Sequence, residues 1–113
     1  MTSVQVQFAI DDVAQGNAIV VELLNAHLIA CAQTIGPVTS RYWWRGSIID
    51  AREWLFLCKT TPERVVDVTE YIRARHPYET PEIVACDITG GLEAYVEWIV
   101  AETQPSANGA ESD

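Results

Sequence analysis

The spacing of apolar residues changes several times along this chain, and each change marks a predicted element. Residues 4–10 alternate apolar and polar side chains, which is typical of a half-buried strand. From residue 13 to about residue 28, apolar residues recur every three or four positions, which predicts a helix capped by Asp11 or Asp12. Gly16 is the one weak position in that helix.

Two long apolar segments follow, and a tight turn joins them. Residues 29–45 are predicted as a strand with a bulge at Gly36-Pro37, and residues 48–60 as a second strand after the turn at Gly46-Ser47. A strand of 13 residues spans over ~40 Å, whereas a domain of this size has a radius of gyration of about 13 Å. The hairpin is therefore expected to overhang its own core, exposing strand edges and the aromatic residues Tyr42, Trp43, Trp44 and Trp54. This predicts oligomerisation by strand addition.

The second half of the chain repeats the strand and helix pattern. Thr61-Pro62-Glu63 favours a helix start, and Pro77 ends that helix at His76. Residues 83–88 are predicted as a strand, and apolar residues from Leu92 to Ile99 mark a last helix. The order strand, helix, strand, strand, helix, strand, helix predicts an α+β ferredoxin-like sandwich in residues 1–102. The polar segment 103–113 is predicted to be a disordered tail.

Composition narrows the classes of partner and location. The chain has 113 residues, 49% of them hydrophobic and 20% charged, which fits one globular domain. A formal net charge of −9 disfavours nucleic acid and anionic membranes as partners. No membrane span or signal sequence is found, so a cytoplasmic location is expected. The three cysteines have no Cys-x-x-Cys spacing and are expected to be reduced.

The segment His76-Pro77-Tyr78-Glu79-Thr80-Pro81-Glu82 combines a helix stop, a rigid corner and several polar side chains. It resembles the signature of the CutA family, the divalent-cation tolerance proteins. Further matches occur in the same order from residue 4 to about residue 100: Ala30-Cys31-Ala32, Ser40-x-Tyr42-x-Trp44-x-Gly46-x-Ile48, Glu53, Lys59-Thr60 and Tyr95-x-x-Trp98-Ile99. The resemblance implies a ferredoxin-like homotrimer with a role in tolerance to divalent metals, copper in particular.

Two sets of candidate ligand residues are compatible with the sequence. Cys31 and His76 offer a thiol and an imidazole, a pair that suits copper or zinc, although two ligands do not make a tight site. His76 can equally be a helix C-terminal histidine bonded to a backbone carbonyl. The charge of the chain permits weak binding of such cations, and no organic cofactor is indicated.

The alternative is a signalling trimer, similar to the nitrogen-regulatory PII proteins, that binds a small anionic molecule between subunits. Lys59 would contact the anion, unless it pairs with Glu82 or Glu53. The other residues of this cluster are His76, Tyr78, Glu82, Tyr42 and Trp44. Catalytic motifs such as Gly-x-Ser-x-Gly and His-Glu-x-x-His are absent from the sequence, so a non-enzymatic protein is expected.

Overall fold

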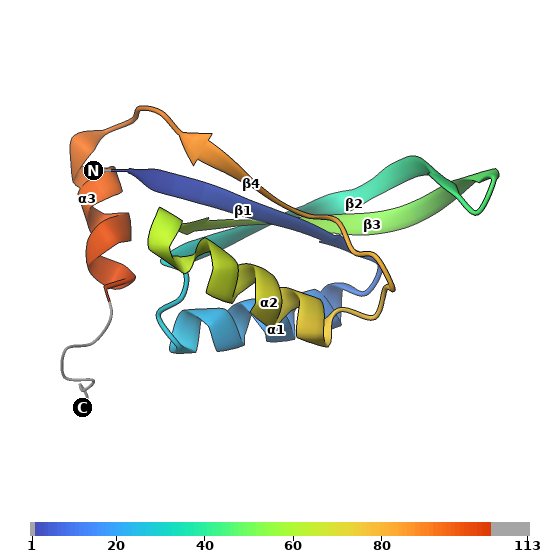
Figure 1. Cartoon of the computed structure of the whole chain (residues 1–113), viewed down its shortest axis with the longest axis horizontal. Coiled ribbons are helices and arrows are strands. Elements are labelled where there is room, and N and C mark those ends of the chain that lie inside the picture. The colour runs from blue at the N-terminus through green and yellow to red at the C-terminus, as the bar shows by residue number, and fades with distance from the viewer. Residues whose placement is uncertain (1, 105–113) are drawn as a thin grey trace.

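A four-stranded antiparallel sheet with two helices on one face forms the body of the molecule (Figure 1). The computed structural model describes residues 2–104. In chain order the elements are β1 (Ser3–Ile10), α1 (Val13–Asn25), β2 (Cys31–Trp44), β3 (Ser47–Thr60), a 3-10 turn (Pro62–Arg64), α2 (Val65–Arg75), β4 (Ile83–Ile88) and α3 (Glu93–Glu102). The strands lie in the order β2-β3-β1-β4. The predicted α+β ferredoxin-like topology is confirmed.

The core lies between the sheet and the pair α1 and α2. Even-numbered residues of β1 point into it, and Phe8 stacks on Phe56 of β3 with ring centroids 4.9 Å apart. Ile19 and Leu23 of α1 and Ile72 of α2 complete its centre. The odd-numbered side chains of β1 point to the opposite face of the sheet, which α1 and α2 leave uncovered (Figure 1). We call this the open face.

Helix α1 begins as predicted and ends earlier than predicted. Asp12 is the N-cap, and its Oδ1 accepts a hydrogen bond from the Gln15 N–H at 3.1 Å. The helix ends at Asn25 because His27 takes a left-handed conformation with φ of 57°. The Leu28 N–H then bonds the Leu23 carbonyl at 3.0 Å, which is the closure expected of a helix C-terminus. The apolar periodicity continued to residue 28 because Leu28 packs against the core from outside the helix.

The β2–β3 hairpin is the longest feature of the molecule. Each strand has 14 residues, and the register shifts between Ile35 and Val38, so the predicted bulge is confirmed. The hairpin runs far past the end of β1 (Figure 1). The molecule therefore measures 48 × 30 × 21 Å, with a radius of gyration of 15.1 Å, against about 13 Å for a compact domain of this length.

Helix α3 closes the end of the sheet opposite the hairpin tip (Figure 1). Thr103 follows it and is buried, and its hydroxyl donates to the Ile99 carbonyl at 2.8 Å. Arg64 Nε donates to the Thr103 carbonyl at 2.9 Å. The ordered part of the chain therefore includes Thr103, which the sequence had placed in the tail. The predicted disorder of residues 105–113 lies outside the described residues.

Candidate functional site

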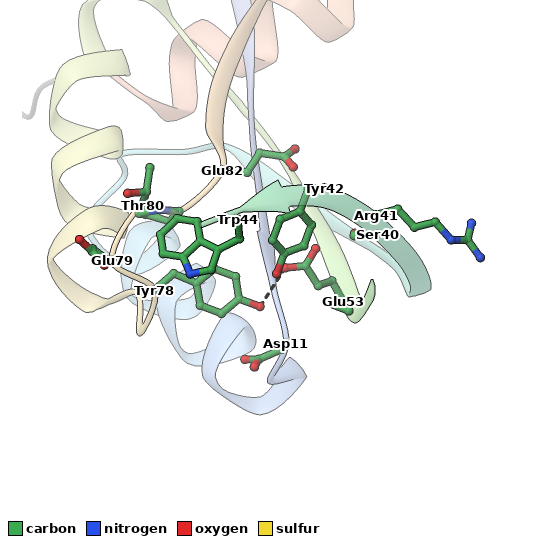
Figure 2. Close-up of a pocket in the computed structure, with 12 residues that line it drawn as sticks. Asp11, Ser40, Arg41, Tyr42, Trp44, Glu53, Tyr78, Glu79, Thr80 and Glu82 are labelled. Atoms are coloured by element: carbon green, nitrogen blue, oxygen red, sulfur yellow. Dashed lines mark hydrogen bonds between the residues drawn. The ribbon is translucent and has the colours of Figure 1, made fainter. Parts of the chain in front are cut away.

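A cleft of about 750 Å³ opens where the hairpin leaves the body of the molecule (Figure 2). Strand β2 contributes Tyr42 and Trp44 to its wall, and β3 contributes Glu53. The loop between α2 and β4 contributes the opposite wall, including Tyr78 and Glu82. Asp11, just after β1, and the exposed Glu79 also line the cavity. We call this cavity the aromatic cleft.

A hydrogen bond between two cleft residues joins its two walls. The Tyr78 hydroxyl donates to Glu53 Oε2 at 2.8 Å, and Figure 2 shows this bond crossing the opening. Only 4% of Glu53 is exposed to solvent. Burial and the hydrogen bond to Glu53 raise the pKa of Tyr78 above its usual range, so the phenol keeps its proton and remains a donor.

His76 is buried next to Tyr78 and holds it in place. Its Nε2 donates to the Ala9 carbonyl at 2.7 Å, and its Nδ1 accepts from the Tyr78 backbone N–H at 3.2 Å. In this arrangement Nε2 carries a proton and the Nδ1 lone pair accepts. Its edge also meets the Tyr78 ring, with centroids 4.6 Å apart. Both nitrogens are occupied, so the geometry matches the helix-end interpretation of His76.

The two candidate metal ligands are not brought together within one chain. Cys31 pairs across the sheet with Lys59, and Lys59 in turn pairs with Gln5 of β1. His76 bonds Ala9, which lies four residues further along β1 than Gln5. At about 3.3 Å per residue this is a separation of about 13 Å along the sheet. Across residues 2–104, no group of three or more His, Cys, Asp and Glu side chains is placed to hold a metal ion.

Cys31 instead has a phenol as its neighbour. Its half-buried Sγ lies 3.3 Å from the Tyr95 hydroxyl of α3. The hydrogen bond to Cys31 and partial burial raise the pKa of Tyr95 to about 12. Cys58 is fully buried, and burial raises its thiol pKa to about 12, while Cys86 is exposed on β4. All three cysteines are free.

Lys59 lies on the open face, away from the aromatic cleft. Its Nζ donates to Gln33 Oε1 at 3.2 Å, and Glu82 accepts from Gln7 Nε2 at 3.0 Å. The ion pairs that we considered for Lys59, with Glu82 or Glu53, are therefore not formed within one chain. Of the predicted ligand residues, the structure brings Tyr42, Trp44, Tyr78 and Glu82 together at the cleft, and leaves Lys59 and His76 outside its lining.

The charge of the cleft is mainly negative. Four carboxylates line it, from Asp11, Glu53, Glu79 and Glu82, against one guanidinium, from Arg41. Arg41 pairs outward with Asp50 at 3.3 Å. Glu79 pairs with Arg45 of the hairpin turn at 3.0 Å. Asp11 was not among the predicted ligand residues, because the sequence indicated a possible helix cap at this position and not a cleft.

Fold and site together define a small α+β protein with an overlong hairpin and an acidic, aromatic cleft at its base. The chain belongs to the CutA1 divalent ion tolerance protein family, whose model matches residues 4–102. The predicted membership is confirmed.

Individual relatives agree with the family match. The divalent-cation tolerance protein CutA of Thermotoga maritima is 38% identical over 78 residues, which cover 69% of this chain and 76% of that protein. The chloroplastic protein CutA 1 of Oryza sativa is 30% identical over 104 residues, covering 92% of this chain and 59% of that longer protein. The crystal structure of CutA1 from Oryza sativa has a TM-score of 0.88 at 29% identity and covers 94% of this chain and 97% of that one.

None of the helices within residues 2–104 is long and apolar enough to cross a membrane.

Proposed function

We propose that this protein acts in tolerance to divalent metal ions as a non-enzymatic, cytoplasmic homotrimer that binds such ions weakly, copper among them. The match to the divalent ion tolerance family over residues 4–102 is the observation that carries the proposal. A formal net charge of −9 favours cations as partners. The sequence motifs give no support to a catalytic role.

Cys31 is the soft ligand that we assign to the metal. Its thiol is half-buried at the sheet end and has only the Tyr95 hydroxyl as a described hydrogen-bond neighbour. Soft thiolate ligands select copper and zinc. Since residues 2–104 form no group of three or more metal-ligating side chains, we assign the remaining ligands to a second subunit. His76 is unsuited to this role, because backbone groups occupy both of its nitrogens.

A homotrimer would provide that second subunit. Within residues 2–104 no strand pairs with the outer edges of β2 and β4, and the open face carries Ile35 and Val84, each about half exposed. Exposed strand edges and apolar patches of this kind are normally covered by another chain.

The alternative PII-like function receives less support. An anion site needs basic groups, and the aromatic cleft has an excess of carboxylates. Lys59, the residue expected to contact the anion, bonds Gln33 elsewhere on the sheet.

Calorimetric titration of the full chain with Zn(II) and Cu(II) tests the metal proposal. We expect saturable binding that Cys31→Ser abolishes and that Cys86→Ser leaves unchanged, since Cys86 is the other cysteine accessible to solvent. Zn(II) is included because it binds thiolates without oxidising them. An equal loss in the two variants, or no saturable binding by the unaltered chain, would contradict the assignment of Cys31.

A further inference from the structure

The aromatic cleft has the walls of a site for an organic cation. Tyr42, Trp44 and Tyr78 line one cavity of about 750 Å³, and Trp44 and Tyr42 remain more than a third exposed there. Figure 2 shows the three rings gathered around the same opening. The faces of such rings attract cations, and aromatic cages are a recurrent means of binding them. The Arg45 guanidinium already lies 5.3 Å from the centroid of the Trp44 ring, whereas no basic side chain of residues 2–104 lies over Tyr42 or Tyr78.

A buried carboxylate in this cleft lacks a cation. Glu53 is 4% exposed, and within residues 2–104 its side chain accepts one hydrogen bond, from the neutral Tyr78 hydroxyl, and forms no salt bridge. A buried charge without an opposite charge is costly, and buried carboxylates are ordinarily paired. Its second oxygen, Oε1, is free of described partners, so the carboxylate can accept a bond from a ligand in the cleft.

The other cleft acids extend this negative charge along the cavity. Asp11 and Glu82 form no salt bridge in the described part of the chain, whereas Glu79 and Arg41 have ion-pair partners. Glu82 accepts from Gln7, a neutral amide. More than one positive charge is therefore needed to neutralise the cleft.

These features favour an amine over a bare metal ion. A metal site needs several ligand atoms around one point, and no such group of three is formed by the described residues. A chain of methylene groups with ammonium groups along it matches separated carboxylates, aromatic walls and a cavity of this volume. We propose that the aromatic cleft binds an aliphatic polyamine, with one ammonium group on Glu53 and its methylene groups against Tyr42, Trp44 and Tyr78. This proposal does not depend on the metal function.

Calorimetric titration of the full chain with spermidine tests this site at low ionic strength. We expect saturable binding that Glu53→Gln weakens about tenfold or more, as expected for loss of a charge-assisted hydrogen bond. Glu97→Gln is the matched control, because Glu97 is exposed on α3, outside the cleft, and its loss changes the net charge equally. Trp44→Leu keeps an apolar wall and removes the ring, so we expect about threefold to tenfold weaker binding.

Three further controls test whether binding is specific and whether the variants are folded. Octane-1,8-diol, an uncharged chain with polar ends, should not bind, and thermal unfolding should show that each variant is folded. Glu82→Gln provides a second charge variant at an exposed residue, where folding is not at stake. Equal weakening by Glu53→Gln and Glu97→Gln, or absence of saturable binding because a neighbouring subunit fills the cleft, would overturn the proposal. Failure here with intact Zn(II) binding would leave the metal proposal standing.

Discussion

At the scale of single residues, His76 shows how one side chain can fix the geometry of a site without lining it. Its two nitrogens connect the end of β1, through the Ala9 carbonyl, to the backbone N–H of Tyr78. Tyr78 then reaches across the cleft to Glu53. His76 is therefore a positioning residue, which acts on the cleft through Tyr78.

We expect His76→Ala to lower the free energy of unfolding by about 1–3 kcal/mol, because the substitution leaves the buried Ala9 carbonyl without its donor. His27→Ala is the matched control. His27 also bonds a carbonyl, that of Glu102 at 2.9 Å, but it is exposed, so water can replace it at a cost of under about 1 kcal/mol. Chemical denaturation of both variants at one protein concentration measures the difference. An equal decrease in the free energy of unfolding for the two variants would show that burial of the His76 hydrogen bonds adds no stability.

The sequence motif predicted four of the cleft residues correctly. It wrongly grouped Lys59 with them. Tyr42, Trp44, Tyr78 and Glu82 were grouped by motif, and the structure places them around one cavity. Lys59 was grouped with them by the same reasoning, and it lies on the open face. The separation is a distance along one strand, because Lys59 and the cleft residue Glu53 are six residues apart on β3, or about 20 Å.

At the scale of elements, Gly16 shows why a weak helix position can be required by packing. A Cβ at this position would lie 2.3 Å from Phe56 Cε1 and 3.0 Å from Ile10 Cγ2. Helix α1 therefore approaches the sheet more closely than any other residue at position 16 would permit. Helical periodicity predicted the helix, but its distance from β3 was not contained in that pattern.

We expect Gly16→Ala to lower the free energy of unfolding by about 1–3 kcal/mol, because overpacking the core outweighs the better helix propensity of alanine. Asn17→Ala is the control, since Asn17 is exposed on the same helix and alanine should there be neutral or slightly stabilising. Thermal and chemical denaturation would compare the two. A stabilised Gly16→Ala variant would show that Phe56 moves aside readily.

At the scale of the whole molecule, the length of the hairpin decides the shape. Strand length alone predicted that the β2–β3 hairpin overhangs the core, and the 48 Å longest dimension of the molecule confirms this. Strand edges and apolar side chains on that overhang cannot be covered by its own core. Trp43 and Ile48 are opposite each other across the hairpin and are 71% and 62% exposed. The prediction of a second chain therefore rests on the shape of the whole molecule and not on any single motif.

We therefore expect light scattering to give three times the 12.6 kDa chain mass in dilute solution. Trp43→Ser combined with Ile48→Ser should lower that mass, because the two substitutions remove exposed apolar area that a neighbouring chain could cover. Val66→Ser is the control, as Val66 is 70% exposed on α2, away from the hairpin (Figure 1). A stable monomer of the unaltered chain would contradict the proposed trimer, and with it the proposal that a second subunit completes a metal site at Cys31. A trimer that survives the hairpin substitutions would place its main contacts on the open face, around Ile35 and Val84, and Val84→Lys would then be the variant that dissociates it.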